Sequence, residues 1–275
     1  MATVKETLLV EARKIMDARK AAYEKISAES PFVAGGGQIY PYDTLGSNLD
    51  LMFSLFQKSG FISDLESNAI KTVCDIGCAN GELALTFAAS GFDTTAIDYT
   101  FKHDRAPYVA KRFSEELGLR VAVADLSVDK PFTIGDVKDS LITDVSTDFS
   151  NEFRFDLVIC FGLLYHLKNP YSFVESLARI SKRVLLGTWV ITHLPDLRVK
   201  VDADPVAWLL DAQDNSDPTN YWFLTEAAFH RIVRRCGFDI EASFNIPNPN
   251  NPLEVAVPNR ADLGIRSFVA LRTSS

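Results

Sequence analysis

The chain has 275 residues, of which 47% are hydrophobic and 23% are charged, and these values are typical of a globular protein with a full core. Its formal net charge of −8 argues against a surface that holds the phosphate backbone of a nucleic acid. The start of the chain has no basic region followed by an apolar stretch, so we expect no signal peptide, and no apolar run is long enough to cross a bilayer. We therefore expect a soluble cytoplasmic protein that acts on a small molecule and binds neither nucleic acid nor membrane.

The cysteines do not indicate a metal site. They form no CxxC pair, and no histidine stands at zinc-finger spacing. Three of the four lie in or beside apolar, strand-like runs. We expect reduced, mostly buried thiols and no bound metal. The four residues are Cys74, Cys78, Cys160 and Cys236.

The first seventy residues predict helices. Apolar residues recur near the helical period over 4–26, and a second such segment over 47–58 begins at Ser47 or Asn48 as its cap. Three consecutive glycines and two prolines in the sequence SPFVAGGGQIYPYD mark a loop between these helices. We expect residues 1–69 to form a helical appendage over one end of the following domain. Whether it acts as a lid or as a homodimer interface stays open.

From Lys71 onward, short apolar runs alternate with helical segments. This alternation predicts a largely parallel sheet with helices on both faces, so residues 70–275 form one α/β, Rossmann-like, doubly wound domain. The usual reversal of strand order places a ligand crevice at the carboxyl ends of the first and fourth strands. A loop joins the last two strands and suggests an antiparallel edge. The expected strands are 71–77, 92–98, 119–125, 153–162, 182–191, 238–246 and 265–272, and the expected helices are 80–90, 105–118, 136–143, 170–181 and 226–236.

The turn after the first strand of this domain has an unusual charge. Residues 75–82 read DIGCANGE, in which Gly77 and Gly81 allow a sharp bend but do not form the GxGxxG pattern of dinucleotide sites. Asp75 and Glu82 flank the turn, and two carboxylates there would repel a pyrophosphate. They would suit a ligand that carries an ammonium or sulfonium group. The turn therefore favours S-adenosylmethionine over a nicotinamide cofactor.

Two further acids end the next two strands. Asp98 falls about 20 residues after the glycine turn, where an acidic side chain can accept both ribose hydroxyls of a bound nucleoside. Asp125 ends the third strand, where it can accept the exocyclic amine of an adenine. Each acid alone could be an ordinary loop or cap residue. Three acids at successive strand ends indicate a binding site instead.

These motifs carry a family resemblance. The segments DIGCANG, IDY, ADL and FDLVICFGLLYHL resemble the class I S-adenosylmethionine-dependent methyltransferase superfamily over roughly residues 70–190. The last segment is also similar to the branch of tRNA wobble-uridine carboxymethyltransferases and uncharacterised small-molecule methyltransferases. The resemblance implies a seven-stranded sheet of order 3-2-1-4-5-7-6 with strand 7 antiparallel. One departure is Ala79, which stands where the family usually has glycine.

The resemblance also implies which residues hold the cofactor. The glycine turn would hold its methionine moiety, Asp98 and Tyr99 its ribose, and Asp125 with Leu126 its adenine. Phe161 and Gly162 would line the methionine side. The turn residues in this set are Asp75, Gly77, Cys78, Ala79, Asn80 and Gly81.

On the acceptor side, His166 follows the fourth strand at the mouth of the crevice. It is our candidate for the general base, with Tyr165 beside it, because imidazole titrates near neutral pH. The alternative is that His166 only shapes the cofactor pocket. Trp189 and His193 lie just past the fifth strand and are expected to contact the acceptor, and Tyr42 is expected to close over it.

We therefore predict an S-adenosylmethionine-dependent methyltransferase for a small acceptor, with O-methylation preferred over N-methylation because of His166. A first alternative is a tRNA-modifying (carboxy)methyltransferase, against which the net charge of −8 argues. A second is a protein that binds the cofactor without catalysis because its acceptor pocket is blocked. A nicotinamide oxidoreductase is disfavoured by Glu82 and by the missing GxGxxG pattern.

Overall fold

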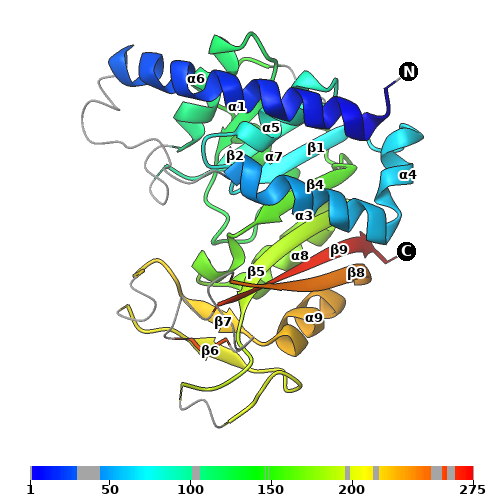
Figure 1. Cartoon of the computed structure of the whole chain (residues 1–275), viewed down its shortest axis with the longest axis vertical. Helices are drawn as coiled ribbons and strands as arrows, with labels where there is room; N and C mark the ends of the chain where they lie inside the picture. Colours follow the sequence, from blue (N-terminus) through cyan, green and yellow to red (C-terminus); the bar gives the residue numbers. More distant parts are fainter. Residues whose placement is uncertain are drawn as a thin grey trace.

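A computed structural model of the chain describes residues 2–29, 44–100, 106–145, 147, 149–195, 199–212, 217–248, 256–258 and 264–274. Its centre is a twisted sheet whose parallel strands all end on the left in Figure 1. Within the described residues, none of the helices combines the length and the apolar content that crossing a membrane requires.

The main body of the sheet has the order β3-β2-β1-β4-β5-β9-β8. Neighbours from β3 to β5 pair in parallel, whereas β9 runs antiparallel to both β5 and β8. The predicted order 3-2-1-4-5-7-6 is confirmed, because β8 and β9 are the sixth and seventh expected strands. The bounds are β1 Thr72–Ile76, β2 Asp93–Asp98, β3 Ala122–Asp125, β4 Leu157–Phe161, β5 Arg183–Val190, β8 Phe238–Pro247 and β9 Ile265–Thr273.

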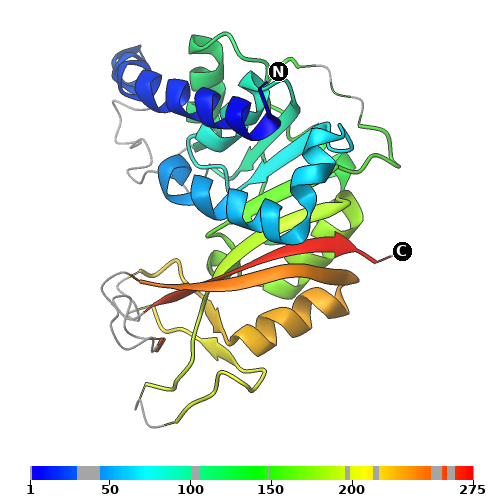
Figure 2. The same ribbon diagram turned by 45° about the vertical axis from the view of Figure 1, so that its right-hand side comes forward.

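Two additional short strands make the described sheet nine-stranded, so the predicted count of seven was wrong. They are β6 (Ala207–Leu209) and β7 (Trp222–Leu224), which form an antiparallel hairpin. Each has three residues, too few to show a strand period in a loop-rich sequence. β7 pairs with β5 at Val190, three residues beyond Gly187, where the pairing of β5 with β4 ends. It uses the same edge of β5 as β4, because β9 occupies the other edge. The hairpin therefore lies past the carboxyl end of β4 (Figures 1 and 2).

Helices cover both faces of the sheet, as expected from the alternating sequence. One apolar cluster joins the first face of the sheet to α1, α3, α4, α5 and α6, and a second joins the other face to α7, α8 and α9. A 3-10 turn, η1, follows β4. The bounds are α1 Val4–Glu29, α3 Thr44–Ser59, α4 Phe61–Glu66, α5 Glu82–Ala89, α6 Ala106–Glu116, α7 Ile134–Asp139, η1 Leu164–His166, α8 Pro170–Ile180 and α9 Glu226–Arg235.

Local sequence signals set the helix starts near the crevice. Asn169 accepts a hydrogen bond from the amide of Ser172 at 3.1 Å, and Pro170 takes the first position of α8. Proline is tolerated there because the first amides of a helix have no partner within the helix. Thr225 caps α9 by accepting from the amide of Ala228 at 3.2 Å.

The expected appendage packs along the sheet face that carries α5 and α6. α1 lies across α5 and α6, and α3 packs against α5, β8 and β9 (Figure 1). Apolar residues of these N-terminal helices belong to the same buried cluster as residues of β1, β4 and β5. A division of the chain at residue 70 stays a prediction.

Glu82 joins the N-terminal helices to the start of α5. Its side chain is 1% exposed, and Tyr23 on α1 and Thr44 on α3 each donate a hydrogen bond of 2.7 Å to it. Arg19 on α1 lies 3.4 Å from the same carboxylate. Burial together with the Glu82 charge raises the pKa of Tyr23, which keeps that hydroxyl protonated as a donor. The carboxylate of Glu82 is therefore held by α1 and α3, which no local sequence pattern indicates.

We predict that Glu82→Gln lowers the free energy of unfolding by about 2 kcal/mol, because the amide cannot accept from both hydroxyls and a buried donor loses its partner. Urea unfolding measures this value, and hydrogen exchange should show faster opening of α1. Glu24→Gln on α1 is the control, since the Glu24 side chain is 70% exposed. Equal stability of the two variants would contradict the role given to Glu82.

Candidate active site

The turn between β1 and α5 has three residues with left-handed backbone angles. Gly77, Ala79 and Gly81 have φ values of 76°, 49° and 82°. A Cβ on Gly81 would lie 2.8 Å from the Cβ of Ala110, and one on Gly77 would lie 3.3 Å from Leu163. Both glycines are thus required by conformation and by close packing. Ala79 takes a conformation that costs a non-glycine residue about 1–2 kcal/mol.

Asp98 holds the strained part of this turn. Its Oδ2 accepts from the amide of Ala79 at 2.7 Å, and its Oδ1 accepts from the amide of Tyr99 at 2.7 Å. The side chain is almost fully buried at the end of β2. Hydrogen bonds from backbone amides to an ionised carboxylate are among the stronger ones. They fix the carboxylate at the wall of the adjoining pocket and help to keep Ala79 in place.

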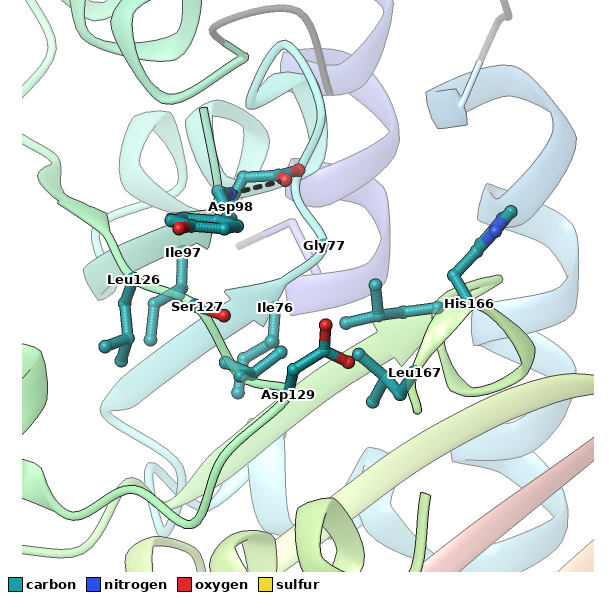
Figure 3. A pocket seen from close by; sticks show the side chains of 12 residues that line it. Ile76, Gly77, Ile97, Asp98, Leu126, Ser127, Asp129, His166 and Leu167 are labelled. Atoms are coloured by element: carbon teal, nitrogen blue, oxygen red, sulfur yellow. Dashed lines mark hydrogen bonds between the residues drawn. The ribbon is translucent and has the colours of Figure 1, made fainter. Parts of the chain in front are cut away.

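A pocket that is partly open to solvent lies at the carboxyl ends of β1 and β2, with about 370 Å³ of empty space that includes the solvent at its mouth. Figure 3 shows Asp98 and His166 on opposite sides of it, with aliphatic side chains between them. Five residues predicted for the site line the pocket, which are Gly77, Asp98, Tyr99, Leu126 and His166. Its other lining residues are Ile76, Ile97, Ser127, Val128, Asp129, Leu163 and Leu167.

Sequence reasoning missed Asp129 and gave the adenine contact to Asp125. Asp125 accepts from the amide of Thr100 at 3.0 Å and from its hydroxyl at 2.6 Å, and it is not among the pocket residues. Asp129 lines the pocket and accepts from the amide of Lys168 at 3.0 Å. It stands four residues beyond β3, so a rule based on strand ends points to Asp125 instead. The adenine role of Asp125 stays a prediction.

Asp75 lies beneath the turn and is 5% exposed. Burial and then the negative charge of Asp98 raise its pKa, a hydrogen bond with the Ala84 backbone lowers it, and the net result is a pKa of about 7. Cys78 and Asn80 on the same turn are also buried. A carboxyl in this setting changes its protonation state near neutral pH, and a cationic ligand nearby would favour the charged form.

Tyr165 stands between the end of β4 and the acceptor side. A Cβ built on Gly162 would lie 3.6 Å from the Tyr165 hydroxyl, an ordinary contact distance, so it is the φ of 81° that favours glycine here. The ring of Tyr165 lies 4.2 Å from that of His166, centre to centre. Phe161 packs edge-on against Phe268 at 5.5 Å and so belongs to the apolar layer beneath.

His166 has a hydrogen-bond partner that fixes its tautomer. The Thr219 hydroxyl donates to Asp217 at 2.6 Å, so its oxygen must accept from His166 Nδ1, which lies 2.9 Å away. The Thr219 carbonyl oxygen, 3.2 Å from Nδ1, can only accept as well. Nδ1 therefore carries the proton in the neutral ring, which leaves the lone pair on Nε2. This Asp217–Thr219–His166 relay has no motif in the sequence.

The β6–β7 hairpin and its flanking loops form a small apolar cap beyond the crevice. Trp189 packs on this cap, whereas His193 lies beside it with Nδ1 2.9 Å from the Thr192 hydroxyl. Tyr42 lies outside the described residues. The cap consists of Ile191, Val201, Leu210 and Phe223 with Tyr165, Trp189, Leu194, Val206 and Trp208 packed against them.

These residues fit S-adenosylmethionine by charge. Two buried carboxylates, Asp75 and Asp98, lie at the turn, and none of the described residues that line the pocket is a lysine or an arginine. A diphosphate would meet negative charge here without a cation to compensate it. A ligand with ammonium and sulfonium groups would meet charge of opposite sign. Asp98 suits the ribose, and Leu126 with Leu163 suits the faces of a flat base.

Comparisons with known proteins agree with this assignment. The family model of the methyltransferase domain matches residues 46–243. A ubiquinone biosynthesis O-methyltransferase of Nitrosospira multiformis is 30% identical over 78% of this chain and 80% of that protein. The protein of the same name from Nitrosomonas europaea is 32% identical over 44% of this chain, and the match spans 42% of its own length. In a crystal structure, a candidate methyltransferase of Bacillus halodurans C-125 shares the fold with a TM-score of 0.52 at 17% identity, covering 81% of this chain and 100% of that one.

The chain therefore belongs to the methyltransferase-domain family. Its Rossmann-like fold and this membership confirm the predicted methyltransferase class and its S-adenosylmethionine cofactor at the level of the family, while the activity of the whole protein stays a proposal. The role of each residue at the site stays a prediction.

We predict that S-adenosylmethionine binds more tightly as the pH rises from 5 to 7. Below its pKa of about 7, Asp75 carries a proton that must leave before it can stabilise a cation, so the affinity should rise by up to about tenfold per pH unit. Calorimetry at several pH values measures this. The Asp75→Asn variant should bind S-adenosylmethionine more weakly, with an affinity that does not change with pH. The affinity of the unmodified protein for uncharged adenosine should also not change with pH. A flat profile for S-adenosylmethionine itself would contradict the role of Asp75.

Proposed function

We propose that this protein transfers the methyl group of S-adenosylmethionine to a hydroxyl oxygen of a small, planar acceptor in the cytoplasm. The observation that carries the proposal is the relay that leaves Nε2 as the basic ring atom of His166, a residue that lines the pocket. A hydroxyl needs such a base to become a good nucleophile at neutral pH. The relatives named as O-methyltransferases support oxygen as the target atom.

The acceptor's shape is suggested by the residues beyond the pocket. Tyr165, Trp189 and Trp208 pack on the apolar cap while keeping partly exposed surfaces. Aromatic rings of this kind stack with flat, apolar ligands and exclude water from the reacting atoms. The proposed acceptor is therefore a hydroxylated ring and not a flexible chain.

The bound cofactor supplies a methyl group on a positively charged sulfur, which is already a good leaving group. The protein's tasks are then to align the two reactants and to take one proton. The glycine turn and Asp98 position the donor side, and the cap positions the acceptor. His166 Nε2 accepts the hydroxyl proton, while Thr219 and Asp217 hold the ring in the required tautomer.

We predict that His166→Ala lowers kcat for a hydroxyl acceptor by about 10²- to 10⁴-fold, as expected for the loss of a general base. Catechol and ortho-phenylenediamine form a matched pair of acceptors, with transfer of a labelled methyl group as the measurement. The unmodified enzyme should methylate catechol on oxygen. Affinity for S-adenosylhomocysteine, measured by calorimetry, shows whether the variant keeps its cofactor site. Full turnover by the variant would remove the base role, and methylation of the diamine alone would overturn O-methylation.

Substitution of Thr219, which we propose as a positioning residue, tests the relay separately. Thr219→Val removes the hydroxyl that joins the imidazole to Asp217, and we expect kcat to fall roughly tenfold with little change in KM, equivalent to about one hydrogen bond. Thr219→Ser keeps a hydroxyl at the same place and should restore most of the rate. If the serine and valine variants behave alike, the hydroxyl is not part of the mechanism.

A further inference from the structure

Arg266 places a cation beside the acceptor side of the crevice. It lies on β9 opposite Trp189, at the carboxyl end of β5. Its guanidinium lies 4.8 Å from the ring centre of Phe268, and its Nη2 donates to Oδ1 of Asn48 on α3 at 2.9 Å. A strand, a helix and an aromatic ring thus hold this side chain in one place.

Arg266 differs in its partners from Arg183 and Arg19, two other partly buried arginines. Arg183 contacts Asp64 at 2.7 Å, and Arg19 lies 3.4 Å from Glu82. Within the part of the chain that the structure describes, Arg266 pairs with no carboxylate. Burial lowers its pKa, which reflects the cost of removing the charge from water. A shielded cation without a counter-ion is expensive, and a ligand of opposite charge would compensate it.

The surroundings connect Arg266 with the reacting groups. Tyr165 is close enough for its charge state to influence the Arg266 guanidinium, and its hydroxyl also lies over Gly162. His166 follows Tyr165 directly, with the two rings in contact. α3 carries both Asn48, which binds Arg266, and Thr44, which binds Glu82 beside the glycine turn. The guanidinium is therefore linked through Asn48 to α3, the helix that also contacts Glu82 beside the cofactor turn, and through Tyr165 to the cap.

We propose that Arg266, together with Asn48 and Tyr165, binds a carboxylate group of the methyl acceptor and so selects acidic hydroxylated rings over neutral ones. This inference rests on the proposed function, because it assigns a further group to the same acceptor. The planar guanidinium matches a carboxylate through paired hydrogen bonds. One cation matches one negative charge, which favours a carboxylate over a doubly charged phosphate ester. Asn48 and Tyr165 are neutral and can donate to it without adding charge.

A carboxylate near Arg266 could also come from the methionine moiety of the cofactor. The two sources predict that a change at Arg266 weakens the binding of different ligands. If the acceptor supplies it, a change at Arg266 weakens acceptor binding and leaves the affinity for S-adenosylhomocysteine intact. If the cofactor supplies it, the affinity for S-adenosylhomocysteine falls for every acceptor alike.

The test compares 3,4-dihydroxybenzoate with the neutral 3,4-dihydroxybenzamide. Both are measured by calorimetry in the presence of S-adenosylhomocysteine and as acceptors of a labelled methyl group. We expect the unmodified enzyme to bind the benzoate at least tenfold more tightly. Arg266→Gln should abolish this preference, while its affinities for the benzamide and for S-adenosylhomocysteine stay within twofold of those of the unmodified enzyme. Arg266→Lys should retain part of the preference. Arg272→Gln, on the same strand but at its far end, is the matched control and should keep the preference.

Thermal unfolding separates binding from a structural role. Without ligand, Arg266→Gln should keep or raise the Tm, because it removes a shielded charge that has no counter-ion among the residues the structure describes. The benzoate should raise the Tm of the unmodified protein but not that of the variant. Equal binding of the two probes by the unmodified enzyme, or a loss of S-adenosylhomocysteine affinity in the variant, would overturn this inference. Arg266-dependent binding of the benzoate without any transfer to oxygen would instead overturn the proposed function.

Discussion

The hydrogen bond from the Ala79 amide to the Asp98 carboxylate fixes the centre of the site. It spans 2.7 Å between the turn after β1 and the end of β2, and both residues are almost fully buried. Because Ala79 has a left-handed conformation, the turn needs a compensating contact in a way that a glycine would not. The same carboxylate forms part of the pocket wall. The shape of the turn and the position of the acid that we propose to bind the nucleoside are thus set by one interaction.

The sequence was sufficient for the parts of the fold that depend on local signals. Apolar runs predicted each strand of the main sheet, and Asn169 with Pro170 marked the start of α8. Residues that act through distant partners could not be predicted. Glu82 was recognised at the start of α5, but its hydrogen bonds reach Tyr23 and Thr44, which are 59 and 38 positions away. No pattern within a short window contains such contacts.

The candidate site likewise contains residues that local sequence signals predict and residues that only the tertiary fold brings together. Gly77 and Asp98 were identified because a turn and a strand end position them, and both line the pocket. Thr219 lies 53 residues from His166, in a segment whose composition indicates only a loop. The relay exists because the amide of Tyr221 donates to the carbonyl of Tyr165 at 2.8 Å, which brings the segment before β7 against η1. Only the tertiary fold gives that loop a chemical role.

The charges of the site are arranged in opposite senses on the two sides of the crevice. Asp75 and Asp98 place negative charge where a sulfonium donor would lie, whereas Arg266 places positive charge on the proposed acceptor side. Transfer of a methyl group from a cation to a deprotonated oxygen cancels one charge of each sign. A shielded site normally makes separated charges costly. We propose that these fixed groups of opposite sign bind the two reactants on their own sides of the crevice, with Asp75 and Asp98 on the donor side and Arg266 at the acceptor's separate carboxylate, and so align them for transfer. The same arrangement disfavours two reactants of like charge, so selection of the acceptor and alignment for transfer follow from one electrostatic design.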